Sequence, residues 1–180
     1  MATQNSSRNV EPEPHNRRFP QQWEIVSKHV DFYGKDVLDM GCGYGDMVAA
    51  VFEAGGSVLG IDHDFDIVKA ANDRMTERFQ LGPAIFQMGI EDLSRTIPYD
   101  IIICFSVLPY LLDKDKVLHW INDYSTTALL EVQYLGDGPG MVRDDILMQE
   151  LLMLIFDSAT PIGKTLVDYR NKWRTIWLCE

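Results

Sequence analysis

The sequence has no long apolar run. None of its stretches reaches the roughly 18 consecutive apolar residues that a membrane-spanning helix needs. Its first residues, Met-Ala-Thr-Gln-Asn-Ser-Ser, lack the apolar core of a secretory signal peptide. We therefore expect a cytoplasmic protein without a membrane span.

Basic residues and cysteines are also scarce. Lys and Arg number 16 against 27 Asp and Glu, which gives a formal net charge of −11. This acidic balance supplies no general electrostatic attraction to nucleic acids or to anionic membranes. The three cysteines, Cys42, Cys104 and Cys179, are widely spaced and include no Cys-x-x-Cys pair. They indicate reduced thiols, and no cluster of His, Cys, Asp and Glu has the spacing of a metal site.

The sequence does contain enough apolar material for one folded domain. The chain of 180 residues is 46% hydrophobic, which excludes wholesale disorder and leaves no room for a second full domain. Residues 1–16 are polar and contain prolines, so we expect a flexible N-terminal tail there. Residues 17–180 are predicted to form a single domain.

Short apolar segments alternate with helical patterns along most of that domain. Amphipathic helical spacing lies between predicted strands at 36–40, 58–61, 84–88, 101–104 and 128–132. Such alternation predicts an α/β fold in which a mostly parallel sheet has helices on both faces.

The C-terminal part departs from this alternation. A helix predicted at 145–156 precedes two strand-like segments, 164–169 and 174–179. Because the gap between these two segments is too short for a parallel crossover, they must form an antiparallel hairpin. The sheet is therefore predicted to close with that hairpin.

A glycine-rich loop follows the first predicted strand. Its sequence, Gly41-Cys42-Gly43-Tyr44-Gly45, lies between a strand and a helix, the context in which such loops bind ligands. A dinucleotide-binding loop needs a third glycine where this chain has Asp46, and a carboxylate there would repel a pyrophosphate. Asp39, before the loop, adds more negative charge. The loop suits a positively charged ligand, whereas the alternative is a tight turn that binds nothing.

An acidic residue also ends the second predicted strand. Asp62 lies about 20 residues after Gly41, where a carboxylate can accept hydrogen bonds from ribose hydroxyls. The alternative role is that of helix N-cap, for which Asp62, Asp64 and Asp66 are all candidates. A nucleoside that carries a cationic group in place of phosphates fits both this acid and the loop.

These two segments resemble the class I S-adenosylmethionine-dependent methyltransferases. The resemblance is carried by Val37-Leu38-Asp39-Met40-Gly41-Cys42-Gly43-Tyr44-Gly45 and, further along the chain, by Gly60-Ile61-Asp62. It covers roughly residues 19–180. It implies a Rossmann-like sheet of seven strands that ends in the antiparallel hairpin. It also implies S-adenosylmethionine as cofactor, S-adenosylhomocysteine as product and in-line transfer of the methyl group.

The resemblance also implies a cofactor site. Asp39 and the glycine loop would contact the methionine part, Asp62 the ribose and His63 the adenine. The family often has an acid after the third strand that reaches the adenine amino group, where this chain has Gly89. The predicted cofactor-binding residues are Arg18, Asp39, Gly41, Cys42, Gly43, Asp62, His63, Ile90, Glu91, Phe105 and Ser106.

Several of these positions have simpler interpretations. Arg18 would meet the methionine carboxylate, or it is a solvated residue of a helix that only packs on the sheet. His63 is equally compatible with an exposed loop. Glu91 would replace the missing acid near adenine, or it only favours the positive end of a short helix.

The acceptor side is predicted at the ends of the fourth and fifth strands. If the acceptor is a hydroxyl or an amine, a general base would remove its proton. The predicted catalytic residues are Glu131, Tyr134 and Asp137, with Tyr110 as a further candidate. The loop after the fifth strand can also be an ordinary surface turn.

We expect a methyltransferase that acts on a small molecule, because the chain is acidic and has no separate acceptor domain. One alternative is a non-catalytic module that binds S-adenosylmethionine as a sensor or scaffold. The other is a methyltransferase that acts on RNA through Arg170, Lys172 and Arg174, although these are more simply solvated charges of the hairpin. The sequence does not set the oligomeric state.

Overall fold

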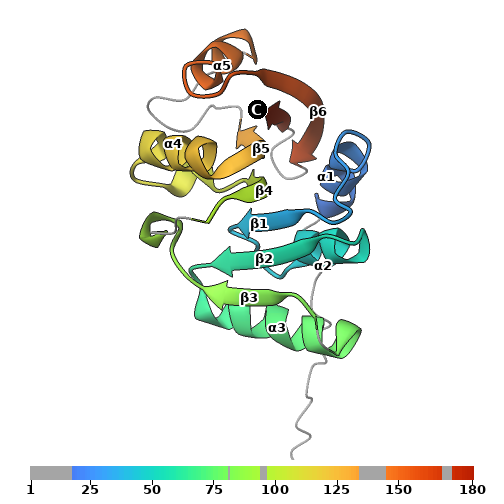
Figure 1. Ribbon diagram of the computed structural model, residues 1–180. Coiled ribbons are helices and arrows are strands. Elements are labelled where there is room, and N and C mark those ends of the chain that lie inside the picture. Colours follow the sequence, from blue (N-terminus) through green and yellow to red (C-terminus); the bar gives the residue numbers. More distant parts are fainter. Residues whose placement is uncertain (1–17, 81, 94–96, 134–144, 168–171) are drawn as a thin grey trace, which may run out of the picture.

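The computed structural model describes residues 18–80, 82–93, 97–133, 145–167 and 172–180 (Figure 1). The predicted tail at 1–16 lies outside these ranges. Within them, no helix is both long enough and apolar enough to cross a membrane.

A seven-stranded sheet forms the centre of the fold, in the order β3-β2-β1-β4-β5-β7-β6. Strands β1 to β5 are parallel, whereas β7 runs antiparallel to both β5 and β6. The predicted α/β fold with an antiparallel C-terminal hairpin is therefore confirmed. The strands are β1 (Asp36–Met40), β2 (Ser57–Asp62), β3 (Ala84–Gln87), β4 (Tyr99–Phe105), β5 (Ser125–Gln133), β6 (Ala159–Val167) and β7 (Lys172–Cys179).

Helices cover both faces of this sheet (Figure 1). One face carries α1 (Phe19–Val26), α2 (Asp46–Glu53) and α3 (Phe65–Phe79), and the other carries α4 (Lys114–Tyr124) and α5 (Asp145–Leu152). The central strands are mostly apolar on both faces because successive side chains enter two different cores. In β1, for example, Val37 belongs to the core on the first face and Leu38 to the core on the second.

Two boundaries differ from the sequence prediction. α5 ends at Leu152 instead of Phe156, because the next turns mix hydrogen bonds to the third and the fourth preceding residue. β6 begins at Ala159, earlier than predicted. Pro161 and Gly163 make that segment look unlike a strand, but proline is tolerated on an edge strand, and the β6–β7 register shifts between these two residues.

Amide side chains close both edges of the sheet. On the β3 edge, Nδ2 of Asn72 donates to the carbonyl of Ile85 (2.8 Å), and Oδ1 accepts from the Ile85 N–H (3.2 Å). On the β6 edge, Gln149 of α5 donates to the carbonyl of Ala159 (2.7 Å), and Gln21 of α1 accepts a backbone N–H near the other end. Each amide takes a place that a further strand would otherwise fill, so these backbone groups are not offered to another chain.

Replacing Asn72 with alanine should destabilise the protein, because both backbone groups of Ile85 lose their partner. The expected loss is about 1–3 kcal/mol in the free energy of unfolding, the usual penalty for unsatisfied polar groups. Urea unfolding of Asn72→Ala, compared with Thr76→Ala at an exposed position of the same helix, measures it. Equal stabilities for the two variants would contradict the role of Asn72 as an edge cap.

Candidate functional site

The glycine loop joins β1 to α2 with a left-handed backbone. Gly41 has a φ of +74° and Gly43 a φ of +53°, values that side chains rarely allow. A Cβ on Gly41 would stand 2.3 Å from Cγ2 of Val107, so packing against the loop after β4 requires glycine here. A Cβ on Gly43 would meet nothing within 4 Å. Gly43 therefore leaves open space beside the backbone, where a ligand can approach closely.

That open space belongs to a cleft of about 620 Å³ at the carboxyl ends of β1 to β4. This volume is in the range of small-molecule sites, and ligands of open α/β sheets bind at this edge. Every residue predicted to bind the cofactor lines this one cleft: Arg18, Asp39, Gly41, Cys42, Gly43, Asp62, His63, Ile90, Glu91, Phe105 and Ser106. The structure brings them together, and their roles toward a ligand stay predictions.

Asp39 is the least satisfied group of the cleft. Its side chain is at the end of β1 and the residue is only 3% exposed, yet Oδ2 has no hydrogen-bond partner among the described residues. Burial, together with the nearby charge of Asp62, raises the pKa of Asp39 to about 7. A buried polar atom without a partner is rare and costly. The carboxylate of Asp39 is therefore suited to a cationic or hydrogen-bonding group of a ligand.

Asp62 connects the second strand to the glycine loop. Its Oδ2 accepts the N–H of Gly43 (3.0 Å), and its Oδ1 accepts the N–H of Asp64 (3.1 Å). Asp64, not Asp62, is the N-cap of α3, because its side chain accepts the first free N–H groups of that helix. Asp62 therefore does not cap the helix, and it lines the cleft. His63 follows it with its side chain 86% exposed, 3.3 Å from Asp62.

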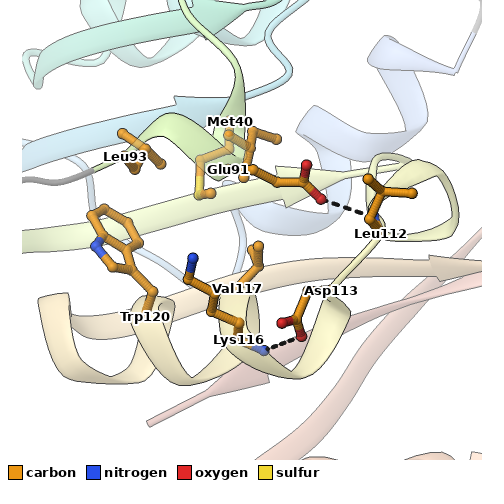
Figure 2. A pocket seen from close by; sticks show the side chains of 9 residues that line it. Met40, Glu91, Leu93, Leu112, Asp113, Lys116, Val117 and Trp120 are labelled. Carbon is orange, nitrogen blue, oxygen red and sulfur yellow. Dashed lines mark hydrogen bonds between the residues drawn. The ribbon is translucent and has the colours of Figure 1, made fainter.

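Glu91 separates the cleft from a second, smaller pocket. This pocket of about 190 Å³ lies between α4 and the short helix η1 (Ile90–Asp92), and Trp120 forms one of its walls (Figure 2). Ile90 and Glu91 line both spaces. Oε1 of Glu91 accepts the backbone N–H of Leu112 (2.8 Å), which fixes the carboxylate on this dividing wall.

Glu131, near the end of β5, is the most heavily bonded carboxylate near the cleft. It is fully buried and accepts hydrogen bonds from Arg18 Nη1 (2.7 Å), Gln22 Nε2 (3.0 Å), Thr165 Oγ1 (2.6 Å) and the hydroxyl of Ser106. Burial alone would raise the pKa of Glu131. The Arg18 guanidinium and the hydrogen bonds outweigh burial and hold that pKa below its ordinary value.

This environment bears on the predicted catalytic residues. A carboxylate with several donors and a lowered pKa is a weak base, and the catalytic role of Glu131 stays a prediction. Tyr134 and Asp137 lie outside the described residues. Tyr110 lines the cleft and is 79% exposed.

Arg174, in the site region, has a different environment from the one predicted from the sequence. It was expected among solvated charges of the hairpin, but it is buried. Its Nη1 donates to the hydroxyl of Ser106 (2.5 Å) and to Oε2 of Glu131 (3.5 Å). The correction follows from the sheet order, because β7 lies between β5 and β6 and its inward side chains have no access to water.

Ser106 is held in an unusual backbone conformation by these contacts. Its φ is +64°, a region that non-glycine residues rarely adopt. The N–H of Ser106 donates to the carbonyl of Glu131 (3.4 Å), and its side chain bonds both Glu131 and Arg174. Such residues tend to occur at functional sites, where surrounding contacts enforce the conformation.

The known sequences that this chain matches include several methyltransferases. Residues 38–125 match the family model of a methyltransferase domain. Similar proteins include the ubiquinone biosynthesis O-methyltransferases of Methylococcus capsulatus (29% identical over 101 residues) and Nitrosospira multiformis (30% over 109 residues). These matches cover 55% and 58% of this chain but 42% and 44% of the relatives. The chain spans less than half the length of these relatives.

Solved structures share the fold over most of the chain. Magnesium protoporphyrin IX methyltransferase from Synechocystis PCC 6803, solved with bound S-adenosylmethionine, matches with a TM-score of 0.68 at 20% identity. That match covers 87% of this chain and 74% of the other. The bifunctional kinase-methyltransferase WbdD matches with a TM-score of 0.75 at 17% identity, over 89% of this chain and 39% of the other. At such identities the likeness shows the fold.

Residues 38–125 thus match a methyltransferase domain, and the chain has the fold of the solved methyltransferases. This confirms the resemblance that the glycine loop and Asp62 predicted. The residues that line the cleft also fit S-adenosylmethionine, which the Synechocystis structure binds. The partnerless Oδ2 of Asp39 suits the cofactor ammonium, the open side of Gly43 allows close approach, and the Arg18 guanidinium suits a carboxylate. Among the described residues of the domain, no group of three or more His, Cys, Asp and Glu side chains is placed to hold a metal ion.

Asp39 should make the stability of the domain depend on pH. Its pKa rises from 3.8 to about 7 on folding. Below pH 4 both states are protonated and Asp39 has no effect. Between pH 4 and 7 the unfolded chain loses the proton and the folded one keeps it, so the free energy of unfolding falls, by roughly 4 kcal/mol at most.

Urea unfolding from pH 4 to 8 measures this effect in the wild type and in Asp39→Asn, which cannot titrate. The variant should gain stability relative to the wild type as pH rises, and the gain should level off above pH 7. Parallel pH profiles for the two proteins would show that Asp39 does not keep its proton on folding.

Proposed function

We propose that this chain is an S-adenosylmethionine-dependent methyltransferase that acts on a small molecule. The observation that carries the proposal is the buried carboxylate of Asp39, whose Oδ2 lacks a partner at the wall of the large cleft. Next to it, the glycine loop leaves its backbone open at Gly43. A ligand that brings an ammonium group would satisfy Asp39, and a dinucleotide would bring phosphates instead.

The residues of the cleft divide the binding of the cofactor among them. Asp39 would hold the ammonium group, Arg18 the carboxylate and Asp62 the ribose hydroxyls. Asp62 also accepts the N–H of Gly43, so one carboxylate fixes the loop and faces the ligand. When bound, the cofactor supplies a methyl group on a positively charged sulfur.

Methyl transfer places limited demands on the protein. The chain must align the acceptor with the methyl group and exclude water, since an in-line displacement needs no covalent intermediate with the enzyme. Phe105 and Ser106 line the cleft directly after β4, and the contacts of Ser106 with Glu131 and Arg174 fix that position. Removal of an acceptor proton stays assigned to Tyr134, Asp137 or Tyr110.

A small-molecule acceptor is supported by the relatives and by charge. The sequence relatives are named for ubiquinone biosynthesis, and one of the similar structures is named for magnesium protoporphyrin IX. Ubiquinone and magnesium protoporphyrin IX are both small molecules. The net charge of −11 opposes binding to a polyanion. Arg174, which the RNA alternative used as a surface charge, is buried beside Glu131.

Thermal unfolding with added ligand tests cofactor binding. S-adenosylmethionine or S-adenosylhomocysteine at 100 times its dissociation constant should stabilise the protein by about 2.7 kcal/mol. For a domain of this size, that is a rise in Tm of roughly 5–10 °C. NAD should give no rise, because Asp46 and Asp39 oppose a pyrophosphate. No rise with either adenosyl ligand would contradict the proposal, provided that mass spectrometry finds no cofactor carried through purification.

Transfer of a labelled methyl group tests the reaction. Cell extract is divided into small-molecule, protein and RNA fractions, and each is incubated with the protein and S-adenosylmethionine labelled in the methyl group. Label in the small-molecule fraction is expected. Label in RNA would overturn the proposed acceptor class, and binding of the cofactor without any transfer would support a sensor.

A further inference from the structure

The small pocket between α4 and η1 is lined mainly by apolar side chains. Its volume is about 190 Å³. A cavity of about 150 Å³ with apolar walls is large enough to hold benzene. This pocket can therefore take one aromatic ring with a small substituent. The apolar residues that line it are Met40, Ile90, Leu93, Leu112, Val117 and Trp120.

Trp120 gives the pocket an aromatic wall. Figure 2 shows the Trp120 side chain extending from α4 toward Leu93 on the opposite side of the pocket. The Trp120 ring also packs against Tyr124, with 5.0 Å between the ring centroids, which restricts the orientation of the indole. An aromatic side chain favours contact with another ring, either stacked or edge-on. The pocket therefore suits a flat ring better than it suits an aliphatic chain.

Three charged residues also line the pocket, and two of them already accept backbone hydrogen bonds. Oε1 of Glu91 accepts the N–H of Leu112 (2.8 Å). Oδ1 of Asp113, the N-cap of α4, accepts the N–H of Lys116 (3.0 Å). The third charged group is the Lys116 ammonium, and it has no hydrogen bond or ion pair with another described residue.

Lys116 supplies unused hydrogen-bond donors to the pocket. In Figure 2 its side chain extends from α4 in the same direction as that of Trp120, toward Leu93. Hydrogen bonds between an ammonium and a charged acceptor are stronger than those to a neutral one. A carboxylate on the bound ring would therefore be the preferred partner of Lys116.

We propose that this pocket is a second ligand site, for a single aromatic ring that carries a carboxylate. The ring lies against Trp120 among the apolar residues, and the carboxylate lies at the Lys116 ammonium. Ile90 and Glu91 form the wall between this pocket and the large cleft, so both spaces can be filled at once. The inference goes beyond the proposed function, since none of these contacts uses the cofactor.

NMR titration of isotope-labelled protein with benzoate and with benzamide tests both contacts. Benzamide has the same ring and nearly the same shape, but it has no charge. The chain has four tryptophans, and the indole N–H signal that disappears in Trp120→Phe belongs to Trp120. Both probes should shift this signal, and benzoate should bind about threefold to fivefold more tightly, the usual effect of an ion pair near the surface. A Trp120 signal that neither probe shifts would overturn the proposal.

Lys116→Met tests the charge, because methionine removes the ammonium and keeps an unbranched side chain. Affinity for benzoate should fall about threefold to fivefold, and affinity for benzamide should stay unchanged. The matched control is Lys69→Met, the same change at an exposed position of α3 that lines neither space. It should bind both probes as the wild type does. Equal losses for both probes in Lys116→Met, or no loss for either, would contradict a carboxylate at the ammonium.

Trp120→Leu tests the aromatic wall, because leucine keeps the position apolar. Both probes should bind this variant about fivefold more weakly, an effect within the range of an aromatic pair. Shifts of backbone amide signals report binding here, and circular dichroism establishes that the variant is folded. Unchanged affinity for both probes in the folded variant would contradict contact with the ring. If Trp120→Leu does not fold, Trp120→Phe replaces it and should retain binding of both probes.

A titration in the presence of S-adenosylhomocysteine separates this pocket from the large cleft. Benzoate should still shift the Trp120 signal when the protein is saturated with S-adenosylhomocysteine, with an affinity changed by less than about tenfold. Competition between the two ligands would place the probe in the cleft and overturn the proposal of a second site. If S-adenosylhomocysteine does not bind, the proposed function is contradicted, whereas the titrations of the two probes still decide this inference.

Discussion

The parallel pairing of β1 with β2 and β4 is the constraint on which the site depends. Met40 pairs with Ile61 on one side and with Cys104 on the other, so these three strands end at the same edge of the sheet. The carbonyl of Ile61 then accepts the N–H groups of Gly41 and Cys42 (2.8 and 2.9 Å), which anchors the glycine loop. The pairing brings Asp39, Asp62 and Phe105 to one cleft although they are far apart in sequence.

Asp39, which lines the cleft, and Glu131, which lies beside it, are buried carboxylates in opposite electrostatic states. Asp39 has an oxygen without a partner and a pKa raised to about 7, so it is poised to accept a cation. Glu131 is surrounded by donors and its pKa is lowered, so it is already neutralised by the protein. The first state suits binding of a ligand, and the second suits support of side chains that face the ligand. Burial alone therefore does not distinguish the two roles, and the arrangement of donors does.

Much of the fold and of the cofactor side could be predicted because both follow from local signals. Continuous apolar strands indicate a sheet covered on both faces, and Asp39, Asp62 and Ser106 each lie within one residue of the end of such a strand. The prediction that Arg174 is solvated was wrong, because its burial depends on the pairing of β7 with both β5 and β6. No local sequence pattern predicts that pairing. A signal was nevertheless present. Alternation along a strand puts Arg174 on the same face as the buried Ile176.

Gln22 was missed for a similar reason. It is buried and bonds Glu131, yet a glutamine on a surface helix is usually solvated. Its position four residues before the buried Val26 places both side chains on the inner face of α1. The start of β6 could not be predicted from the local sequence, because Pro161 and Gly163 are unfavourable in most strands. They are tolerated here because β6 is an edge strand whose register shifts between these two residues.

The most direct test of cofactor binding by Asp39 is the count of protons released when S-adenosylhomocysteine binds. Titration calorimetry at pH 6 in buffers with different heats of ionisation gives this count. With a pKa of about 7, the Asp39 carboxyl is mostly protonated before binding, and an ammonium partner requires its ionised form. The wild type should release close to one proton, and Asp39→Asn close to none. Tight binding by the wild type without proton release would contradict the assignment of the ammonium group to Asp39.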